Sequence, residues 1–252
     1  MKKTVVYCFY HTGKGKSMLH IKIADLQIAI GHEYGYLPKL CQGFLTEEAT
    51  PDLTVELTSA DVEREAQRAV EPHSPAYMEG LACYRKIADM LSETDGCLLH
   101  GVLMEMDGRG ILICAHSGVG KSTHARMWQE SFGAERCQIV NGDKPLLRKI
   151  DGKIYGYGTP WCGKEGIRQN RRVAITDILL ISRGKENKCL PLSPKEALRP
   201  LMDQVYVPDC SVTARLQVLD LVNGLLSSVG LYKVECTPTP EAAQVAYRGI
   251  FH

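Results

Sequence analysis

The sequence predicts an α/β fold whose mixed sheet is built largely from β-hairpins, on three observations. Apolar strand patterns are joined by Asp-Gly in CLLHGVLMEMDGRGILICA and again in PLLRKIDGKIYGYG, and Asp-Gly between two such runs is a strong hairpin signal. Helical spacing of apolar residues recurs between the strand patterns and dominates from residue 193 onward. The glycine-rich run GVGK joins the strand pattern ILIC to the helical pattern STHARMWQE. Together these features indicate a strand–loop–helix unit inside a mixed sheet.

The composition suits one large domain or two small ones. The chain has 252 residues, of which 44% are hydrophobic and 23% charged, so it can bury an ordinary globular core. The patterns change near residue 96. We therefore expect a mostly β region with a helix over residues 1–95 and a second domain over residues 96–252. The net charge of +1 provides no general basic field, so no nucleic-acid partner is expected.

The cysteines and the N-terminus bear on the compartment. None of the ten cysteines forms C-x-x-C, and they are scattered through apolar runs rather than clustered as in a disulfide framework or a zinc site. The N-terminus lacks an apolar stretch of signal-peptide length, and no run approaches the roughly 18 apolar residues of a membrane helix. These features predict a cytoplasmic protein with reduced thiols and no membrane partner. The oligomeric state stays open, with a homo-oligomer as one option.

The elements of the first region follow from its periodicity. Strands are expected where β-branched and aromatic residues gather or alternate with polar ones. A helix is expected where apolar residues recur at helical spacing behind Ser74, which can cap its first turn. The expected strands are residues 3–10, 20–32 and 52–58, and the expected helix is residues 74–93.

The second region alternates strands and helices before it becomes mainly helical. Its expected strands are residues 97–106, 109–115, 137–141, 173–184 and 232–236, with a further hairpin over residues 145–160. Its expected helices are residues 121–133, 193–206, 211–229 and 239–251, the first of them closed by Gly133.

Two segments end in Gly-Lys-Ser and compete as phosphate-binding loops. Such a loop must follow a buried strand and open a helix, so that backbone N–H groups and the helix dipole converge on the phosphate. The segment AHSGVGKS, residues 115–122, has both neighbours. The segment HTGKGKS, residues 11–17, is followed by a strand pattern and is better interpreted as a basic β-turn.

The segment 115–122 predicts which residues bind the nucleotide. Lys121 would reach the β and γ phosphates, and the hydroxyl of Ser122 would bind magnesium. Ala115 stands where the usual pattern has its first glycine, which is tolerable if its φ stays negative. A glycine-rich structural turn is the alternative interpretation. The nucleotide-binding residues expected are Ser117, Gly118, Val119, Gly120, Lys121, Ser122 and Thr123.

Three neighbouring features are candidates for the chemistry. His100 precedes the loop by one strand, and Asp143 ends the strand after the loop helix, where phosphate-loop enzymes hold magnesium or accept the proton of the nucleophile. A buried histidine and a turn aspartate are the structural alternatives. Residues 158–170, GTPWCGKEGIRQN, make a poor strand and a good functional loop, in which Trp161 and Lys164 would face the acceptor.

Residues 100–123, HGVLMEMDGRGILICAHSGVGKST, resemble the kinase domain of bacterial HPr kinase/phosphorylase, a fold shared with phosphoenolpyruvate carboxykinase. A histidine-glycine strand, a hairpin and a loop of the form G-x-S-G-x-G-K-S occur in the same order in that family. The similarity extends more weakly through Asp143 and the segment KEGIR. It implies a P-loop kinase core of this type, preceded here by a β-rich region unlike the family's usual N-terminal domain.

The resemblance implies specific roles and an ATP- and magnesium-dependent reaction. Asp143 would be the catalytic base and a magnesium ligand, His100 would lie beside the transferred phosphate, and Arg168 would neutralise developing charge. Glu165 would be a further metal ligand, with Ser122. Gly142 stands where the family has the first of two adjacent aspartates, so a Gly142→Asp substitution is expected to restore a carboxylate pair and to tighten magnesium binding.

The function expected is a kinase that transfers the γ-phosphoryl group of ATP to a hydroxyl. The acceptor would be a serine of a protein or peptide, or a small serine-like molecule. The missing carboxylate at Gly142 keeps a second hypothesis open, a nucleotide-binding regulatory or scaffold protein whose catalysis has decayed. A carboxykinase-like lyase is less favoured, because a chain of this length shows no cluster of ligands for a second metal.

Overall fold

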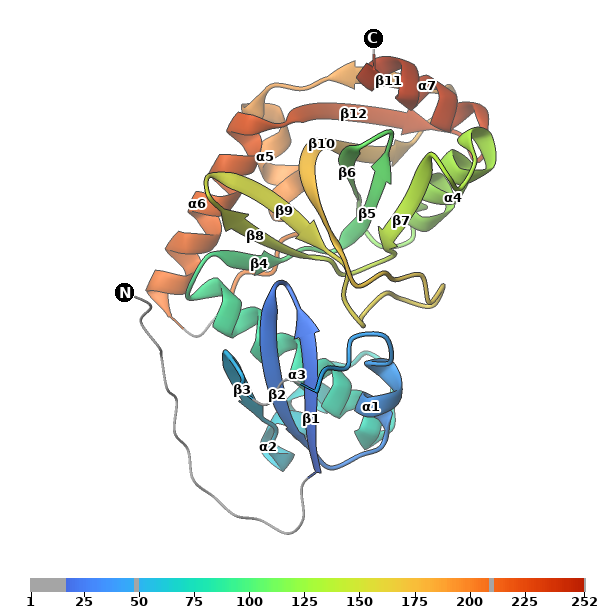
Figure 1. Ribbon diagram of the computed structural model, residues 1–252. Coiled ribbons are helices and arrows are strands. Elements are labelled where there is room, and N and C mark those ends of the chain that lie inside the picture. The colour runs from blue at the N-terminus through green and yellow to red at the C-terminus, as the bar shows by residue number, and fades with distance from the viewer. Residues whose placement is uncertain (1–16, 48–49, 209–210, 252) are drawn as a thin grey trace. The chain divides into compact units, whose positions relative to one another are not determined.

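A computed structural model describes residues 17–47, 50–208 and 211–251 of the chain (Figure 1). By its internal contacts the chain divides into two compact units, Met1–Ile87 and Ala88–His252. The division falls inside one long helix, and each unit is described by itself. The strand expected over residues 3–10 and the basic turn over residues 11–16 lie outside the described residues.

The first unit combines a small sheet with helices. The strands pair in the order β1-β2-β3, with β1 antiparallel and β3 parallel to β2. Helix α3 confirms the expected helix, and the Ser74 hydroxyl accepts the Tyr77 N–H at 3.3 Å. The elements are β1 (Ser17–Ile23), β2 (Leu26–His32), α1 (Tyr36–Leu40), β3 (Leu53–Glu56), α2 (Ser59–Arg68) and α3 (Pro75–Ser92).

One expected strand is in fact a hairpin. Residues 20–32 fold as parts of β1 and β2 around Ala24 and Asp25, both in the left-handed region with φ of 53° and 59°. A two-residue hairpin turn of type I′ needs positive φ at both positions, usually from Asn-Gly or Asp-Gly. Because Ala-Asp is not such a pair, the alternation of apolar and polar residues continues through the turn and predicts a single strand.

The second unit confirms a mixed α/β architecture. Its nine-stranded sheet curls in the order β4-β8-β9-β10-β6-β5-β7, and β12 joins β10 and carries β11 beyond it. The strands are β4 (Gly96–Leu98), β5 (Gly101–Met106), β6 (Arg109–Cys114), β7 (Cys137–Asn141), β8 (Leu146–Ile150), β9 (Lys153–Tyr157), β10 (Arg172–Arg183), β11 (Lys188–Pro191) and β12 (Gly230–Cys236). The helices are α4 (Lys121–Phe132), α5 (Pro194–Met202), α6 (Val212–Ser228) and α7 (Glu241–Phe251).

Both expected Asp-Gly hairpins are confirmed. Asp107 and Gly108 join β5 to β6, and Asp151 and Gly152 join β8 to β9, all four with positive φ as a type I′ turn requires. Strand β11 was not expected from the sequence. It is four residues long and mostly exposed, so it offers little periodicity.

Helices cover both faces of the large sheet (Figure 1). One apolar core includes Leu201 of α5 and Leu225 of α6, packed on the sheet. The other includes Trp128 of α4 and Ala246 of α7. Because both faces are buried, the central strands are nearly continuous apolar runs, as ILIC and DILLI show in the sequence.

The arrangement of strands brings several chain segments to one edge of the sheet. Strand β10 lies parallel to β6 and to β12, so the carboxyl ends of all three meet at that edge. Strand β5 is antiparallel to β6, with Gly101 opposite Cys114, so its start lies at the same edge. Ligands of α/β proteins bind outside the carboxyl ends of parallel strands. A functional site is therefore expected at this edge of the sheet.

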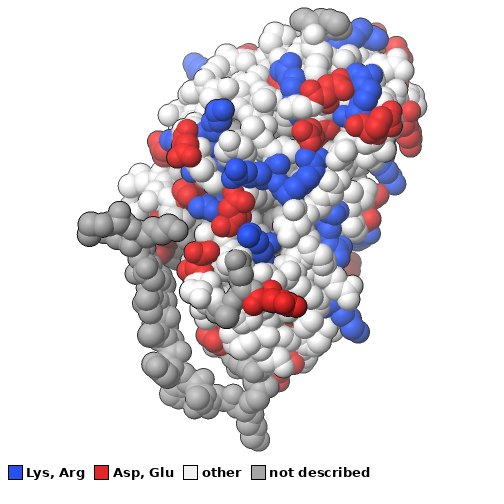
Figure 2. Space-filling view, in the orientation of Figure 1, with Lys and Arg blue, Asp and Glu red and all other residues white. Residues whose placement is uncertain are grey.

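The thiols and the surface agree with the composition. The eight cysteines in the described ranges are free, and six of them are buried. No described helix is long and apolar enough to cross a membrane. On the face drawn in Figure 2, basic and acidic side chains lie next to one another over the described surface, as a net charge of +1 suggests.

Candidate active site

The glycine-rich loop lies between β6 and α4 at this edge. Gly118 and Gly120 have φ of 78° and 120°, which L side chains rarely adopt. A Cβ atom on either would meet no heavy atom within 4 Å, so the backbone there borders open space. Ala115 has no positive φ, which is the condition under which alanine can replace the usual glycine. The loop therefore has the conformation that its glycines suggest, and a ligand can approach its backbone closely.

The N-terminus of α4 is uncapped by any side chain. Its N-cap residue is Gly120, which makes no side-chain hydrogen bond, and the first turn contains no acidic residue. The first amides of a helix lack intrahelical acceptors and carry the positive end of the helix dipole. Ser122 is half-buried and Thr123 is exposed in this first turn. The helix start therefore offers donors that suit an anion.

Lys121 is held across the loop. Its side chain is largely buried, with 8% of the residue exposed, and Nζ donates a hydrogen bond to the carbonyl oxygen of Ala115 at 2.8 Å. Burial lowers the pKa of Lys121, and the nearby Asp143 carboxylate opposes that shift. The ammonium group is thus close enough to Asp143 to sense its charge, and its hydrogen-bond partner is a neutral carbonyl.

Asp143 lies just beyond the end of β7, between two basic side chains. Its Oδ1 is 3.3 Å from Nε2 of His100, and its Oδ2 is 3.2 Å from Nζ of Lys144. Burial alone would raise the pKa of Asp143, but the hydrogen bond with His100 and the charge of Lys144 outweigh it, and the pKa lies below its ordinary value. The carboxylate is therefore ionised at neutral pH.

Asn141 fixes the turn that carries Asp143. It is fully buried, and its Oδ1 accepts the backbone N–H groups of Asp143 and Lys144 at 3.0 and 2.7 Å. Its Nδ2 donates to the carbonyl and hydroxyl oxygens of Thr159, both at 3.1 Å. The sequence interpretation missed this role. The signal was present, because an asparagine two residues before an aspartate is typical of an Asx-turn.

Residues 158–170 pass directly against Asp143. Gly163 has a φ of 75°, and a Cβ atom there would lie 2.9 Å from Cβ of Asp143. Lys164 is exposed and forms no side-chain hydrogen bond or ion pair with the described residues. Trp161 is buried, with 6% of its surface exposed, so in this structure its ring packs inside the protein. Of the two residues expected to face an acceptor, only Lys164 lies open to solvent.

The remaining two candidate residues of this segment, Glu165 and Arg168, contact other residues. Glu165 pairs with Arg126 of α4, with Oε2 and Nη1 3.1 Å apart. Nη1 of Arg168 lies 3.5 Å from Sγ of Cys162 and from the carbonyl oxygen of Gly166. No group of three His, Cys, Asp or Glu side chains that could hold a metal occurs in the described ranges. Magnesium usually binds one or two carboxylates together with substrate phosphates and water, so Ser122 and Asp143 remain a suitable donor pair.

Gly142 does not point into the loop. A Cβ atom there would lie 2.9 Å from the carbonyl oxygen of Cys162 and 3.5 Å from that of Ile167, and the Gly142 N–H donates to Ile167 at 3.0 Å. A side chain at position 142 would therefore collide with residues 158–170. The expectation that Gly142→Asp restores a carboxylate pair at the metal is not supported by this geometry.

Gly142→Ala is expected to destabilise the second unit by about 1–3 kcal/mol, because overpacking against backbone costs that much. The contact is with a carbonyl rather than with a flexible side chain, so it cannot be relieved by a rotamer change. Denaturant unfolding of both proteins measures the difference. An unchanged midpoint would show that residues 158–170 move away freely.

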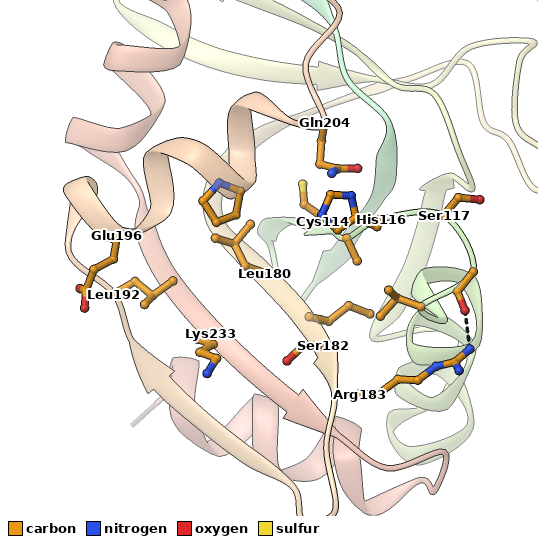
Figure 3. Close-up of a pocket in the computed structure, with 15 residues that line it drawn as sticks. Cys114, His116, Ser117, Leu180, Ser182, Arg183, Leu192, Glu196, Gln204 and Lys233 are labelled. Carbon is orange, nitrogen blue, oxygen red and sulfur yellow. Dashed lines mark hydrogen bonds between the residues drawn. The ribbon is translucent and has the colours of Figure 1, made fainter.

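Two cavities flank the loop. The larger, of about 710 Å³, lies between the loop, β10 and α5, with Gln204 and His116 toward one end and Leu192 and Lys233 toward the other (Figure 3). The smaller, of about 450 Å³, lies between the loop, the start of α4 and the ends of β10 and β12. Arg183 lines both.

His124 is buried beside the smaller cavity without a hydrogen-bond partner. It is 2% exposed, and neither ring nitrogen has a partner in the described chain. Burial lowers its pKa from 6.5 to about 4. The imidazole is therefore neutral near pH 7, with one nitrogen able to donate and the other able to accept.

This histidine should make the stability of the protein fall with acid. Between pH 6.5 and about 4 the unfolded chain binds a proton at His124 that the folded protein excludes, so unfolding becomes easier as the pH drops through this window. The loss should reach about 3 kcal/mol. In His124→Leu this part of the pH dependence should vanish. Unfolding free energies of both proteins at several pH values test it, and equal slopes would contradict it.

Comparisons with known proteins add only a distant likeness. No family model matches the chain, and no curated protein matches its sequence. Among solved structures, the Hpr(Ser) kinase/phosphatase from Coxiella burnetii is similar at a TM-score of 0.37 and 11% identity, over 60% of this chain and 88% of that one. A likeness at this TM-score says nothing about the activity of this chain.

Proposed function

We propose that the protein is an ATP- and magnesium-dependent kinase that transfers the γ-phosphoryl group to a hydroxyl. The acceptor class is a serine of a protein or peptide, or a small serine-like molecule. The observation that carries the proposal is that the glycine loop, the uncapped start of α4, the buried Lys121 and Asp143 lie at one edge of the sheet, with Lys121 near enough to Asp143 for their charges to interact. A purely structural turn would not need a buried lysine in front of an ionised aspartate.

The loop and Lys121 bind the phosphates in this proposal. Phosphate oxygens accept from the amides around Gly118 to Thr123, and the helix dipole favours their charge. The Lys121 ammonium exchanges the neutral carbonyl of Ala115 for the β and γ phosphates, which are stronger acceptors because they are charged.

Asp143 accepts the proton of the acceptor hydroxyl. As the hydroxyl oxygen bonds to the γ-phosphorus, the bond from that phosphorus to the bridging oxygen breaks, ADP leaves, and the proton moves to the carboxylate. The lowered pKa of Asp143 keeps the carboxylate ionised and ready to accept. His100 and Lys144 fix its orientation from both oxygens, and Asn141 fixes the backbone beneath it.

Charge on the phosphoryl group is balanced by the cations around it. Lys121 and Lys144 flank Asp143, and Arg168, on the adjoining segment, would add to them by turning from its weak contacts at Cys162 and Gly166. Magnesium, when bound, supplies further positive charge at the phosphates. Ser122 and Asp143 would hold it. Glu165 would join them only by releasing Arg126.

A regulatory nucleotide-binding protein is the second candidate. The observation in its favour is the single carboxylate of the NGD turn, since Gly142 leaves Asp143 without the adjacent acidic partner of the resembling family. ADP release separates the two. The kinase should release little ADP alone and much more with a suitable acceptor, whereas the binding protein releases none with any.

The direct test incubates the protein with ATP, magnesium and candidate acceptors, which include serine-containing peptides and free serine derivatives. Mass spectrometry then looks for the addition of one phosphate group to a hydroxyl. Asp143→Asn serves as the matched inactive variant. Tight ATP binding without transfer to any acceptor would favour the regulatory protein. Absence of ATP binding would overturn both candidates.

A further inference from the structure

The nucleoside of a nucleotide bound at the loop needs a site beside it. In the proposed function the terminal phosphate lies at Lys121 and Asp143, so the rest of the nucleotide must extend away from them. Asp143 and His100 lie on the β5 and β7 side of β6. On the other side of β6 stand β10 and β12, which are parallel to it and end at the same edge. The chain ends these strands at Arg183 and Cys236.

A cavity of about 450 Å³ lies on that side. The amides and side chains of the loop and the first turns of α4 form one wall, and the ends of β10 and β12 form the other. Neither Lys121, Asp143 nor His100 lines it. A volume in this range suits a small organic group. Its residues are Gly118, Val119, Gly120, Thr123, His124, Met127, Arg183, Gly184, Cys236, Thr237 and Pro238.

Arg183 ties this cavity to the loop. Its Nη2 donates to the carbonyl oxygen of Gly118 at 2.6 Å, the dashed contact of Figure 3. Arg183 is exposed and forms no ion pair with a carboxylate in the described parts of the chain. A planar guanidinium group in this position can stack on a flat ring while it holds the loop. The contact therefore joins the phosphate loop to the wall of the cavity.

The wall of this cavity includes a buried polar side chain, His124. The buried imidazole of His124 has no hydrogen-bond partner among the described residues and lies two residues after Ser122 on α4. A buried polar side chain without a partner costs free energy unless something satisfies it. Adenosine offers ring nitrogens, an amino group and ribose hydroxyls, which can complement a neutral imidazole.

We propose that this cavity binds the nucleoside of the nucleotide, with Arg183 covering it and His124 in its wall. The inference rests on the proposed function, because it assigns the nucleoside end of the same ligand. The strand order supports it independently of any resemblance. It places phosphate chemistry on the β5 and β7 side of the loop strand and nucleoside recognition on the β10 and β12 side.

The experiment compares ATP with inorganic tripolyphosphate, which has the same phosphate chain and no nucleoside. Calorimetry measures both affinities for the wild type, for Thr237→Trp and for Pro238→Trp, which fill the cavity from the wall opposite the loop. Filling it should weaken ATP binding roughly tenfold or more, since overpacking a site costs 1–3 kcal/mol. Tripolyphosphate binding should stay within roughly twofold of the wild type by the same reasoning.

Glu130→Trp is the matched control. Glu130 is exposed on α4, two turns beyond Thr123, and lies outside the cavity. It should bind both ligands as the wild type does. If both cavity variants bind ATP normally, or lose ATP and tripolyphosphate equally, the nucleoside lies elsewhere and the inference is wrong while the proposed function stands. If the wild type binds neither ligand, the proposed function itself fails.

Discussion

Lys121→Ala should abolish measurable phosphoryl transfer while the second unit stays folded. The lysine supplies positive charge at the start of the loop, close enough to Asp143 for the two charges to interact, and no other described side chain donates to the Ala115 carbonyl. Removing one preorganised donor from a site where charge develops lowers turnover by roughly 10²–10³. Loss of ground-state phosphate binding adds to that. Turnover is measured by ADP release with a saturating acceptor, and folding by denaturant unfolding.

Two lysines provide controls for this experiment. Lys16 belongs to the competing Gly-Lys-Ser segment that lacks a following helix pattern, so Lys16→Ala should be close to neutral. Lys153 is exposed on β9, and Lys153→Ala should be neutral as well. Wild-type turnover in Lys121→Ala would show that the loop was wrongly assigned. A loss of transfer in Lys16→Ala would return attention to the other segment.

Asp143→Asn should lower turnover by roughly 10²–10⁴, the usual contribution of a general base. The amide keeps the shape of the side chain and one accepting oxygen, but it cannot take a proton. Nucleotide affinity should change less, because the loop amides and Lys121 make most of the phosphate contacts. Calorimetry with ATP and mass spectrometry of the acceptor, on the same preparation, separate the two effects.

The contact between Asp143 and His100 allows a second test of the proposed base. His100→Gln removes the group 3.3 Å from Oδ1 but leaves the carboxylate. If Asp143 is the base, this variant should retain more activity than Asp143→Asn. Unchanged transfer in Asp143→Asn would remove Asp143 from the mechanism and leave His100 as the next candidate base.

The sequence predicted most of the second unit because local signals and packing agree there. Asp-Gly turns, apolar runs and one glycine-closed helix each match the observed elements, and the mixed sheet follows from them. The sequence also predicted His100 and Asp143 near the loop, but it placed His100 inside one strand over residues 97–106, whereas His100 lies between β4 and β5. The roles assigned to them stay predictions.

Other features depend on contacts between distant residues and had no local signal. Glu165 was expected at the metal, but its carboxylate lies beside Arg126 of α4. Residues 158–170 pack against Gly142 and leave no room for a side chain at that position. No spacing in the sequence predicts this contact. Helix α2 was missed although Thr58 and Asp61 form a capping box, because few apolar residues mark its inner face.

Strand β6 lies between two groups of strands, and this position separates the substitutions that affect one part of the site from those that affect the other. All the side chains proposed for the chemistry lie within residues 100–168. The far wall of the smaller cavity, in contrast, is formed by the ends of β10 and β12. We expect substitutions at the end of β12 to leave the turn that Asn141 supports unchanged, whereas Arg183 at the end of β10 also holds the loop through Gly118. In the proposed kinase, preference among nucleotides could therefore change at the end of β12 without rebuilding the groups proposed to move the phosphate.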